Sequence, residues 1–158
     1  MASDNDLRYH YLGGDIGLVT NSAGGCMAIC DLIEQLGAKP ANFSDLGGQA
    51  IHEQIEALLY LLQNDPNVKV IFINVFGGIL NVDKVIATLK IQIRLGIMSK
   101  PIVIRARGLK SDGAEEILKE DYEGGIYFER EMDEAVKLAI KLSKEVQAKE
   151  TNTVGADN

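Results

Sequence analysis

Apolar residues along the chain follow two kinds of pattern that alternate. Short runs rich in β-branched residues, such as VKVIFINV at 68–75, are followed by longer stretches in which apolar residues recur three or four positions apart. The first pattern is typical of strands covered on both faces, and the second is typical of amphipathic helices. Their regular alternation predicts repeated βα units and a parallel sheet.

Five strands and five helices are predicted from these patterns. The strands are 16–20, 41–46, 68–75, 101–106 and 125–128, and the helices are 24–36, 50–63, 81–95, 112–119 and 131–147. Because the run at 68–75 is nearly continuously apolar, we expect it at the centre of the sheet. The pattern favours an α/β fold with a doubly wound, five-stranded parallel sheet, flavodoxin-like, in the strand order 2-1-3-4-5. We expect a single domain at 13–147, with a lead-in at 1–12 and a flexible tail at 148–158.

Composition restricts the classes of partner. The 158 residues are 46% hydrophobic and 25% charged, which is ordinary for a globular domain. The 16 basic residues are outnumbered by 23 acidic ones, and a nucleic-acid surface requires clustered Lys and Arg. No apolar run approaches the length of a membrane span, and no targeting segment is visible. We therefore expect neither a nucleic-acid nor a membrane partner.

Two turns are candidates for ligand binding. Ligands of open α/β sheets bind beyond the carboxyl ends of the strands, where the strand order reverses, and the turns at 20–25 (TNSAGG) and 76–81 (FGGILN) should meet there. Each leads a strand into a helix through small residues, so free N–H groups and a positive helix end should hold an anion without a lysine. A third turn, at 45–49, likewise leads a strand into a helix through glycines. The alternative is a plain connection, because every βα unit needs a tight turn and neither the Walker nor the dinucleotide motif is present.

Histidines and cysteines offer little chemistry. His10 and His52 are far apart in the chain and lack a partnering cysteine pair, so we predict no metal site and no catalytic residue. Cys26 and Cys30 lie one helical turn apart on one face, where a disulfide does not form easily. We interpret both as free core thiols.

Three segments, read together, resemble a known family. They are LRYHYLGGDIGLVTNSAGGCMAICDLIEQLGAKPANFSDLGGQA, IFINVFGGILNVDKVIA and PIVIRARG, of which KPANFSDLGG and NVFGGI are the most specific parts. In order and spacing they resemble the carboxy-terminal, CoA-ligase domain of the β subunit of succinyl-CoA synthetase, the succinate–CoA ligase of the citric acid cycle. The similarity covers about residues 7–147.

The resemblance implies a substrate- and α-subunit-binding role in nucleotide-coupled interconversion of succinyl-CoA and succinate. In the family, the α subunit binds CoA and carries a phosphohistidine, while an ATP-grasp domain of the β subunit binds ATP or GTP and Mg. By matching position, the helix start facing the phosphohistidine comprises Ser22, Ala23 and Gly24, and the substrate-binding residues are Asn21, Gly78, Ile79 and Leu80, the last three through their backbone.

The resemblance further implies that this chain is part of a ligase and is inactive alone, binding no cofactor by itself. Expected partners are the α subunit and succinate, in the mitochondrial matrix of a eukaryote or otherwise in the cytoplasm. Ser22, Gly25, Gln49 and Arg107 depart from the family pattern, so a divergent, non-catalytic interaction module on the same fold is the alternative. A receiver-type signalling domain is a third interpretation, but the central strand carries Asn74 where a phosphoacceptor aspartate is required.

Overall fold

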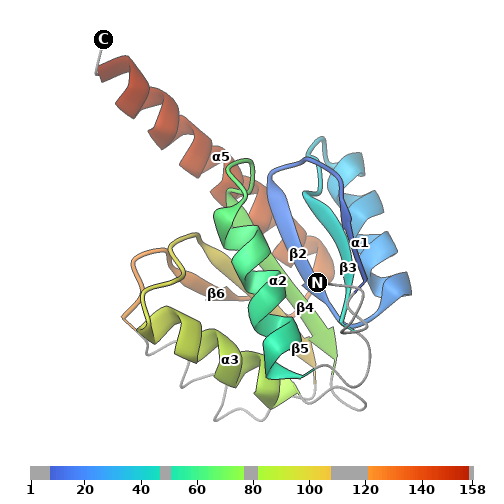
Figure 1. The fold of residues 1–158 in the computed structure, drawn as a ribbon. Coiled ribbons are helices and arrows are strands. Elements are labelled where there is room, and N and C mark those ends of the chain that lie inside the picture. Colours follow the sequence, from blue (N-terminus) through green and yellow to red (C-terminus); the bar gives the residue numbers. More distant parts are fainter. Residues whose placement is uncertain (1–7, 47–50, 77–81, 108–120, 157–158) are drawn as a thin grey trace.

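The computed structural model describes residues 8–46, 51–76, 82–107 and 121–156. Its strands are β1 (Arg8–Tyr11), β2 (Ile16–Thr20), β3 (Asn42–Asp45), β4 (Val70–Phe76), β5 (Ile102–Arg107) and β6 (Ile126–Phe128). Its helices are α1 (Ala23–Gln35), α2 (His52–Asn64), α3 (Val82–Arg94) and α5 (Met132–Ala156). Every predicted element within these residues is present, within a few residues of its predicted ends except at the end of α5 (Figure 1). The predicted helix at 112–119 lies outside the described residues.

A parallel sheet organises the molecule. Its hydrogen-bonded strand order is β2-β4-β5-β6, so β4, the most apolar strand, has a neighbour on each side as predicted. The register aligns Thr20 of β2 with Asn74 of β4 and Asn74 with Arg105 of β5. Three neighbouring strands therefore bring one polar residue each to the same level near their carboxyl ends.

Strand β3, the second predicted strand, lies beside β2 as the predicted order requires. Many of the hydrogen bonds between β3 and β2 are made by side chains of β3. The amide of Asn42 accepts from the N–H of Leu18 at 2.8 Å and donates to its carbonyl at 3.0 Å, and the hydroxyl of Ser44 donates to the same carbonyl at 2.6 Å. The backbone of β3 forms instead an antiparallel ladder with β1, a strand in the predicted lead-in that was not predicted.

Helices cover both faces of the sheet, as the doubly wound prediction requires. One buried cluster joins Ile71 and Ile73 of β4 to the apolar sides of α2 and α3. The other joins Val70 and Phe72 to α1 and α5. Successive residues of β4 thus enter opposite cores, which is why this strand is apolar at nearly every position.

Helix ends follow from local chemistry, with one exception. Helices α1 and α3 each end in a glycine with positive φ, Gly37 at 85° and Gly96 at 73°, whose N–H groups satisfy terminal carbonyls of the helix. Helix α5, in contrast, continues to Ala156, past its predicted end at 147, and projects from the body of the domain (Figure 1). In the part of the chain that the structure describes, no helix is long and apolar enough to cross a membrane.

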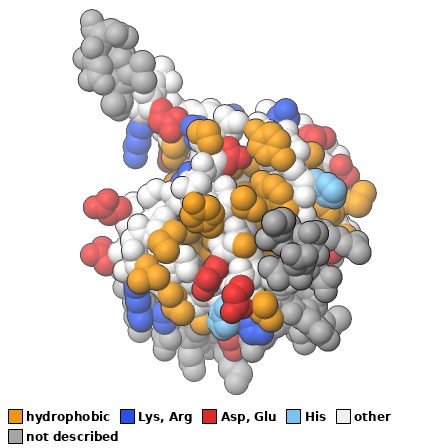
Figure 2. Space-filling view, in the orientation of Figure 1, with side chains coloured by type: hydrophobic (Ala, Val, Ile, Leu, Met, Phe, Trp, Pro, Cys, Tyr) orange, Lys and Arg blue, Asp and Glu red, His pale blue; other side chains and the backbone are white. Residues whose placement is uncertain are grey.

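The outer surface of α2 and α3 mixes apolar and charged side chains (Figure 2). Exposed apolar residues on these helices include Tyr60, Leu61 and Ile91, which are 62%, 41% and 48% exposed. Tyr60 and Leu61 are adjacent in a segment without charged residues, 57–64, whereas Ile91 follows Lys90. Single exposed apolar side chains of this kind are common on protein surfaces.

Candidate functional site

The start of α1 lies directly after the carboxyl end of β2. Ser22 has an extended backbone, with φ −148° and ψ 124°, and its hydroxyl accepts a hydrogen bond from the N–H of Gly25 at 3.2 Å. Its carbonyl accepts from the N–H of Cys26 at 2.9 Å, the first bond of the helix. Ser22 is therefore the N-cap of α1, a position at which serine is strongly preferred.

The positive end of α1 is open and not neutralised by its own first turn. No acidic residue occurs in that turn. Gly24 is exposed, and a Cβ placed on it would meet no atom within 4 Å. Asn21 and Ala23 are half-buried beside it. The predicted residues 21–24 therefore form a helix start that an anion can approach from solvent.

A buried polar network lies on the neighbouring strands. The Nη1 of Arg105 donates to Oδ1 of Asn74 at 2.9 Å, and its Nε donates to the carbonyl of Arg130, just before α5, at 2.9 Å. Asn74 is fully buried and Arg105 is 7% exposed. Arg105 thus ties β4 and β5 to the start of α5, at the level at which β2 leads into α1. Among the described residues, the Nδ2 of Asn74 has no hydrogen-bond partner, which is rare for a buried donor.

Sequence reasoning missed this network. It treated Asn74 only as the absence of an aspartate and Arg105 only as part of a motif. The available signal was that both polar residues interrupt otherwise apolar strands near their carboxyl ends, where the parallel register places them side by side.

The other predicted site residues cannot be placed. Gly78, Ile79 and Leu80 lie outside the described residues, as do residues 47–50 of the third turn. Their strands do end at the predicted edge: β4 is hydrogen-bonded to β2 in parallel and ends at Phe76, and the N–H of Leu46 donates to the carbonyl of Thr20 at 2.9 Å. The contribution of residues 78–80 to a substrate site stays a prediction.

Cysteines 26 and 30 are both free, as predicted. A hydrogen bond from the Cys30 thiol lowers the pKa of Cys26 to about 7, and the same bond raises the pKa of Cys30. Cys26 is fully buried in the core beneath α1, so its sulfur is not available to a substrate. Cys30 is half-buried and packs against the same core, so the prediction of a core thiol is confirmed in full only for Cys26.

The two histidines lie apart and contact different partners. The Nδ1 of His52 lies 2.5 Å from the hydroxyl of Thr88, which donates to the carbonyl of Lys84. The ring of His10 packs against Phe43, with 6.1 Å between centroids. Within the described ranges, no three His, Cys, Asp or Glu side chains gather into a possible metal site.

Comparison with known proteins identifies the family. The model of the CoA-ligase family matches residues 19–140. The chain belongs to the CoA-ligase family. It is 38% identical over 148 residues to the succinate–CoA ligase [ADP-forming] subunit beta 2 of Archaeoglobus fulgidus, covering 92% of this chain and 38% of that protein. It is 40% identical over 136 residues to the corresponding beta subunit of Ignicoccus hospitalis, covering 86% of this chain and 35% of that subunit.

These matches confirm the predicted resemblance. The CoA-ligase domain spans less than two fifths of the length of these two relatives. The archaeal ATP citrate lyase of Methanothrix soehngenii, in complex with citrate and coenzyme A, superposes with a TM-score of 0.69 at 20% identity, over 89% of this chain and 43% of the lyase chain. A Francisella response-regulator receiver domain superposes with a TM-score of 0.54 at 18% identity, over 84% of this chain and 98% of that domain. Both similarities show the shared α/β fold alone.

Proposed function

We propose that this chain is the substrate- and α-subunit-binding domain of a succinate–CoA ligase β subunit. In this role the start of α1 receives the phosphoryl group of a phosphohistidine carried by the α subunit, and the same crevice holds succinate. The observation that carries the proposal is the α1 start, a serine-capped helix end whose first turn holds no acidic residue and which is exposed at Gly24.

The proposed reaction requires this chain to position the phosphoryl group and does not require a reactive side chain from it. Phosphoryl transfer is accelerated mainly by holding the group in line and stabilising its charge. Backbone N–H groups at the α1 start are held in place by the Ser22 cap, so they need little reorganisation to bind phosphoryl oxygens. The Arg105 bridge holds β4, β5 and the start of α5 in fixed relation beneath this edge.

Other parts of the assembly would supply the remaining chemistry. The α subunit would bring CoA and the histidine, and an ATP-grasp domain would bring ATP or GTP with Mg. The proposed role of this chain is limited to binding and orienting the phosphoryl group and succinate.

Reconstitution tests the proposal. The chain is co-expressed with an archaeal succinate–CoA ligase α subunit and with the matching β subunit truncated to remove its CoA-ligase domain, and succinate-dependent ADP formation is measured. We expect turnover with all three components and none when this chain is omitted. A complex that assembles without turnover, or no detectable association with the α subunit, would contradict the proposal.

A non-catalytic interaction module is the second candidate, favoured by one observation. Strand β5 ends at Arg107, a base where the family pattern has an acid. Association with the α subunit but no turnover, together with turnover restored by Arg107→Glu, would select this alternative.

A further inference from the structure

A cavity of about 490 Å³ opens at the amino edge of the sheet, at the end opposite to the start of α1. The turn between β1 and β2, the loop after α1, the residues entering β4 and one side of α5 line it. This volume lies within the range of small-molecule sites. None of the residues assigned above to the phosphohistidine or to succinate contributes to it.

Its charge differs from that of the molecule as a whole. The chain has a net charge of −7, yet Lys39, Lys69 and Lys144 all line this cavity against one carboxylate, that of Asp15. Glu150 lies 2.8 Å from Lys69, and counting it still leaves three ammonium groups against two carboxylates. The lining is therefore a local excess of positive charge on an acidic protein.

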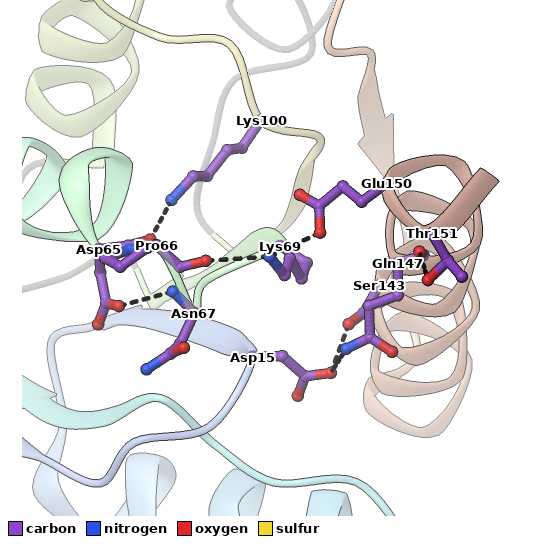
Figure 3. Close-up of polar contacts among 10 residues, drawn as sticks. All are labelled: Asp15, Asp65, Pro66, Asn67, Lys69, Lys100, Ser143, Gln147, Glu150 and Thr151. Carbon is purple, nitrogen blue, oxygen red and sulfur yellow. Dashed lines mark hydrogen bonds and ion pairs between the residues drawn. The ribbon is translucent and has the colours of Figure 1, made fainter. Parts of the chain in front are cut away.

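Neighbouring groups engage the charges of Asp15 and Lys69 (Figure 3). Asp15 accepts from the hydroxyl of Ser143 at 2.6 Å and from Nε2 of Gln147 at 2.9 Å. The ammonium of Lys69 donates to the carbonyl of Pro66 at 2.9 Å as well as to Glu150. For the ammonium groups of Lys39 and Lys144, in contrast, no hydrogen-bond or ion-pair partner is found in the part of the chain that the structure describes.

In the β1–β2 turn, which lines this cavity, the backbone N–H groups already donate hydrogen bonds within the protein. Those of Gly13, Gly14 and Asp15 donate to the carbonyls of Ala41, Pro40 and Lys39 at 3.0–3.1 Å. This turn therefore offers an anion no N–H donor, and the charged donors of the cavity are its lysine ammonium groups.

We infer that this cavity binds a small molecule that carries phosphate groups, with Lys39 and Lys144 as its direct contacts and Lys69 as the third positive group. Lysine binds phosphate as a point charge, which suits groups that stand on different elements and converge on one space. The volume exceeds that of a single phosphate, so the ligand class is a polyphosphate or a phosphorylated organic molecule.

Backbone-amide NMR of the 158-residue chain tests the inference. Orthophosphate, pyrophosphate and metal-free ATP are titrated separately at about 0.15 M ionic strength, at which charges farther away than roughly 8 Å are largely screened. Chemical-shift changes are followed at Gly14, Lys39 and Asn67. We expect pyrophosphate or ATP to shift these amides and to bind more tightly than orthophosphate. Lys39→Gln and Lys144→Gln should each weaken binding by about threefold to tenfold.

Lys141→Gln is the matched control, because it makes the same charge change on the exposed side of the same helix, outside the cavity. It should change the affinity by less than about twofold. An equal loss in Lys141→Gln and Lys144→Gln would overturn the inference, as would shifts confined to the start of α1. Absence of any shift at the cavity up to about 10 mM ligand would also overturn it. The wild-type shift pattern decides the question even if a variant fails to fold.

Discussion

The two edges of the parallel sheet offer an anion two different environments. At the carboxyl edge the charge is the fixed partial charge of a helix start, capped by Ser22 and free of acidic residues in its first turn. At the amino edge the charge is carried by three lysine side chains that converge on a cavity beside Asp15. One edge presents preorganised backbone donors, and the other presents long, mobile side chains.

This difference indicates different uses. Fixed N–H donors favour a group that must be held in one geometry during a reaction, because nothing has to reorganise. Lysine side chains lose rotamer freedom when they are fixed and tolerate several ligand shapes, which suits binding without chemistry. In the proposed function, the reacting phosphoryl group therefore binds at the less charged of the two edges.

The largest difference between the two edges should appear when one glycine at each edge is replaced by alanine and the free energy of unfolding is measured. A Cβ at Gly14 would lie 2.1 Å from the carbonyl oxygen of Lys39 and 2.4 Å from that of Pro40, both backbone atoms. We expect Gly14→Ala to lower the free energy of unfolding by about 3 kcal/mol or more. Gly24→Ala, with open space around it, should raise it by up to about 1 kcal/mol. Urea denaturation measures both, and equal effects would refute the described close approach at the amino edge.

The next largest effect should come from the carboxyl edge. Arg105→Met removes the donors to Asn74 and to the carbonyl of Arg130 and leaves a buried amide oxygen unpaired, at a cost of about 2–3 kcal/mol. Arg130→Met is the control, because that side chain is exposed and only its backbone carbonyl is used. Similar denaturation midpoints for the two variants would show that the bridge does not stabilise the domain.

A smaller effect is expected where the amino edge holds α5. Asp15→Ala leaves the buried hydroxyl of Ser143 without its acceptor and frees Gln147, so the free energy of unfolding should fall by about 1–2 kcal/mol. Amide hydrogen exchange of α5 should accelerate mainly after residue 143. Asp31→Ala, an exposed carboxylate of α1, is the control. Unchanged exchange in Asp15→Ala would contradict the anchoring role.

A pH-dependent effect concerns Lys100, which also lies near the amino edge. Its ammonium donates to the carbonyls of Leu62 and Asp65 at 2.7 Å each, and burial lowers its pKa from 10.5 to about 8. Between these values the unfolded chain binds a proton that the folded chain has released. The free energy of unfolding contributed by this group should therefore rise with pH from about 8 to 10.5.

Lys100→Met should flatten this part of the stability profile, measured by urea denaturation at a series of pH values. Lys141→Met, which removes an exposed lysine, is the control. The same change of slope in both variants would rule out burial of Lys100 as its cause.

Hydrophobic periodicity was enough to predict the sheet, its central strand and the described helices, because these depend on which faces of each element are buried. Strand β1 escaped prediction since its partner, β3, lies more than thirty residues away and the strand itself is only the four residues RYHY, the shortest run in which alternation can be recognised. The end of α5 was missed because residues 151–155, TNTVG, are all weak helix formers, so the sequence predicts a tail there. The helix nevertheless continues to Ala156, since no proline interrupts this segment.

At the site, local patterns identified the α1 start because a helix N-cap is encoded within a few residues. The Asn74–Arg105 bridge and the lysine cavity could not be found in that way. Each is assembled from distant segments, and the sequence signal at each position is one ordinary polar residue.

The most direct test of the central claim exchanges Ser22 in the reconstituted ligase described above. Asparagine and aspartate cap a helix about as well as serine, so Ser22→Asn and Ser22→Asp should fold alike. Only aspartate places a negative charge where the phosphoryl group is expected to sit. We predict that Ser22→Asn keeps kcat within about tenfold of wild type and that Ser22→Asp lowers it by a further hundredfold or so. Equal turnover in the two variants would contradict an anion at the start of α1.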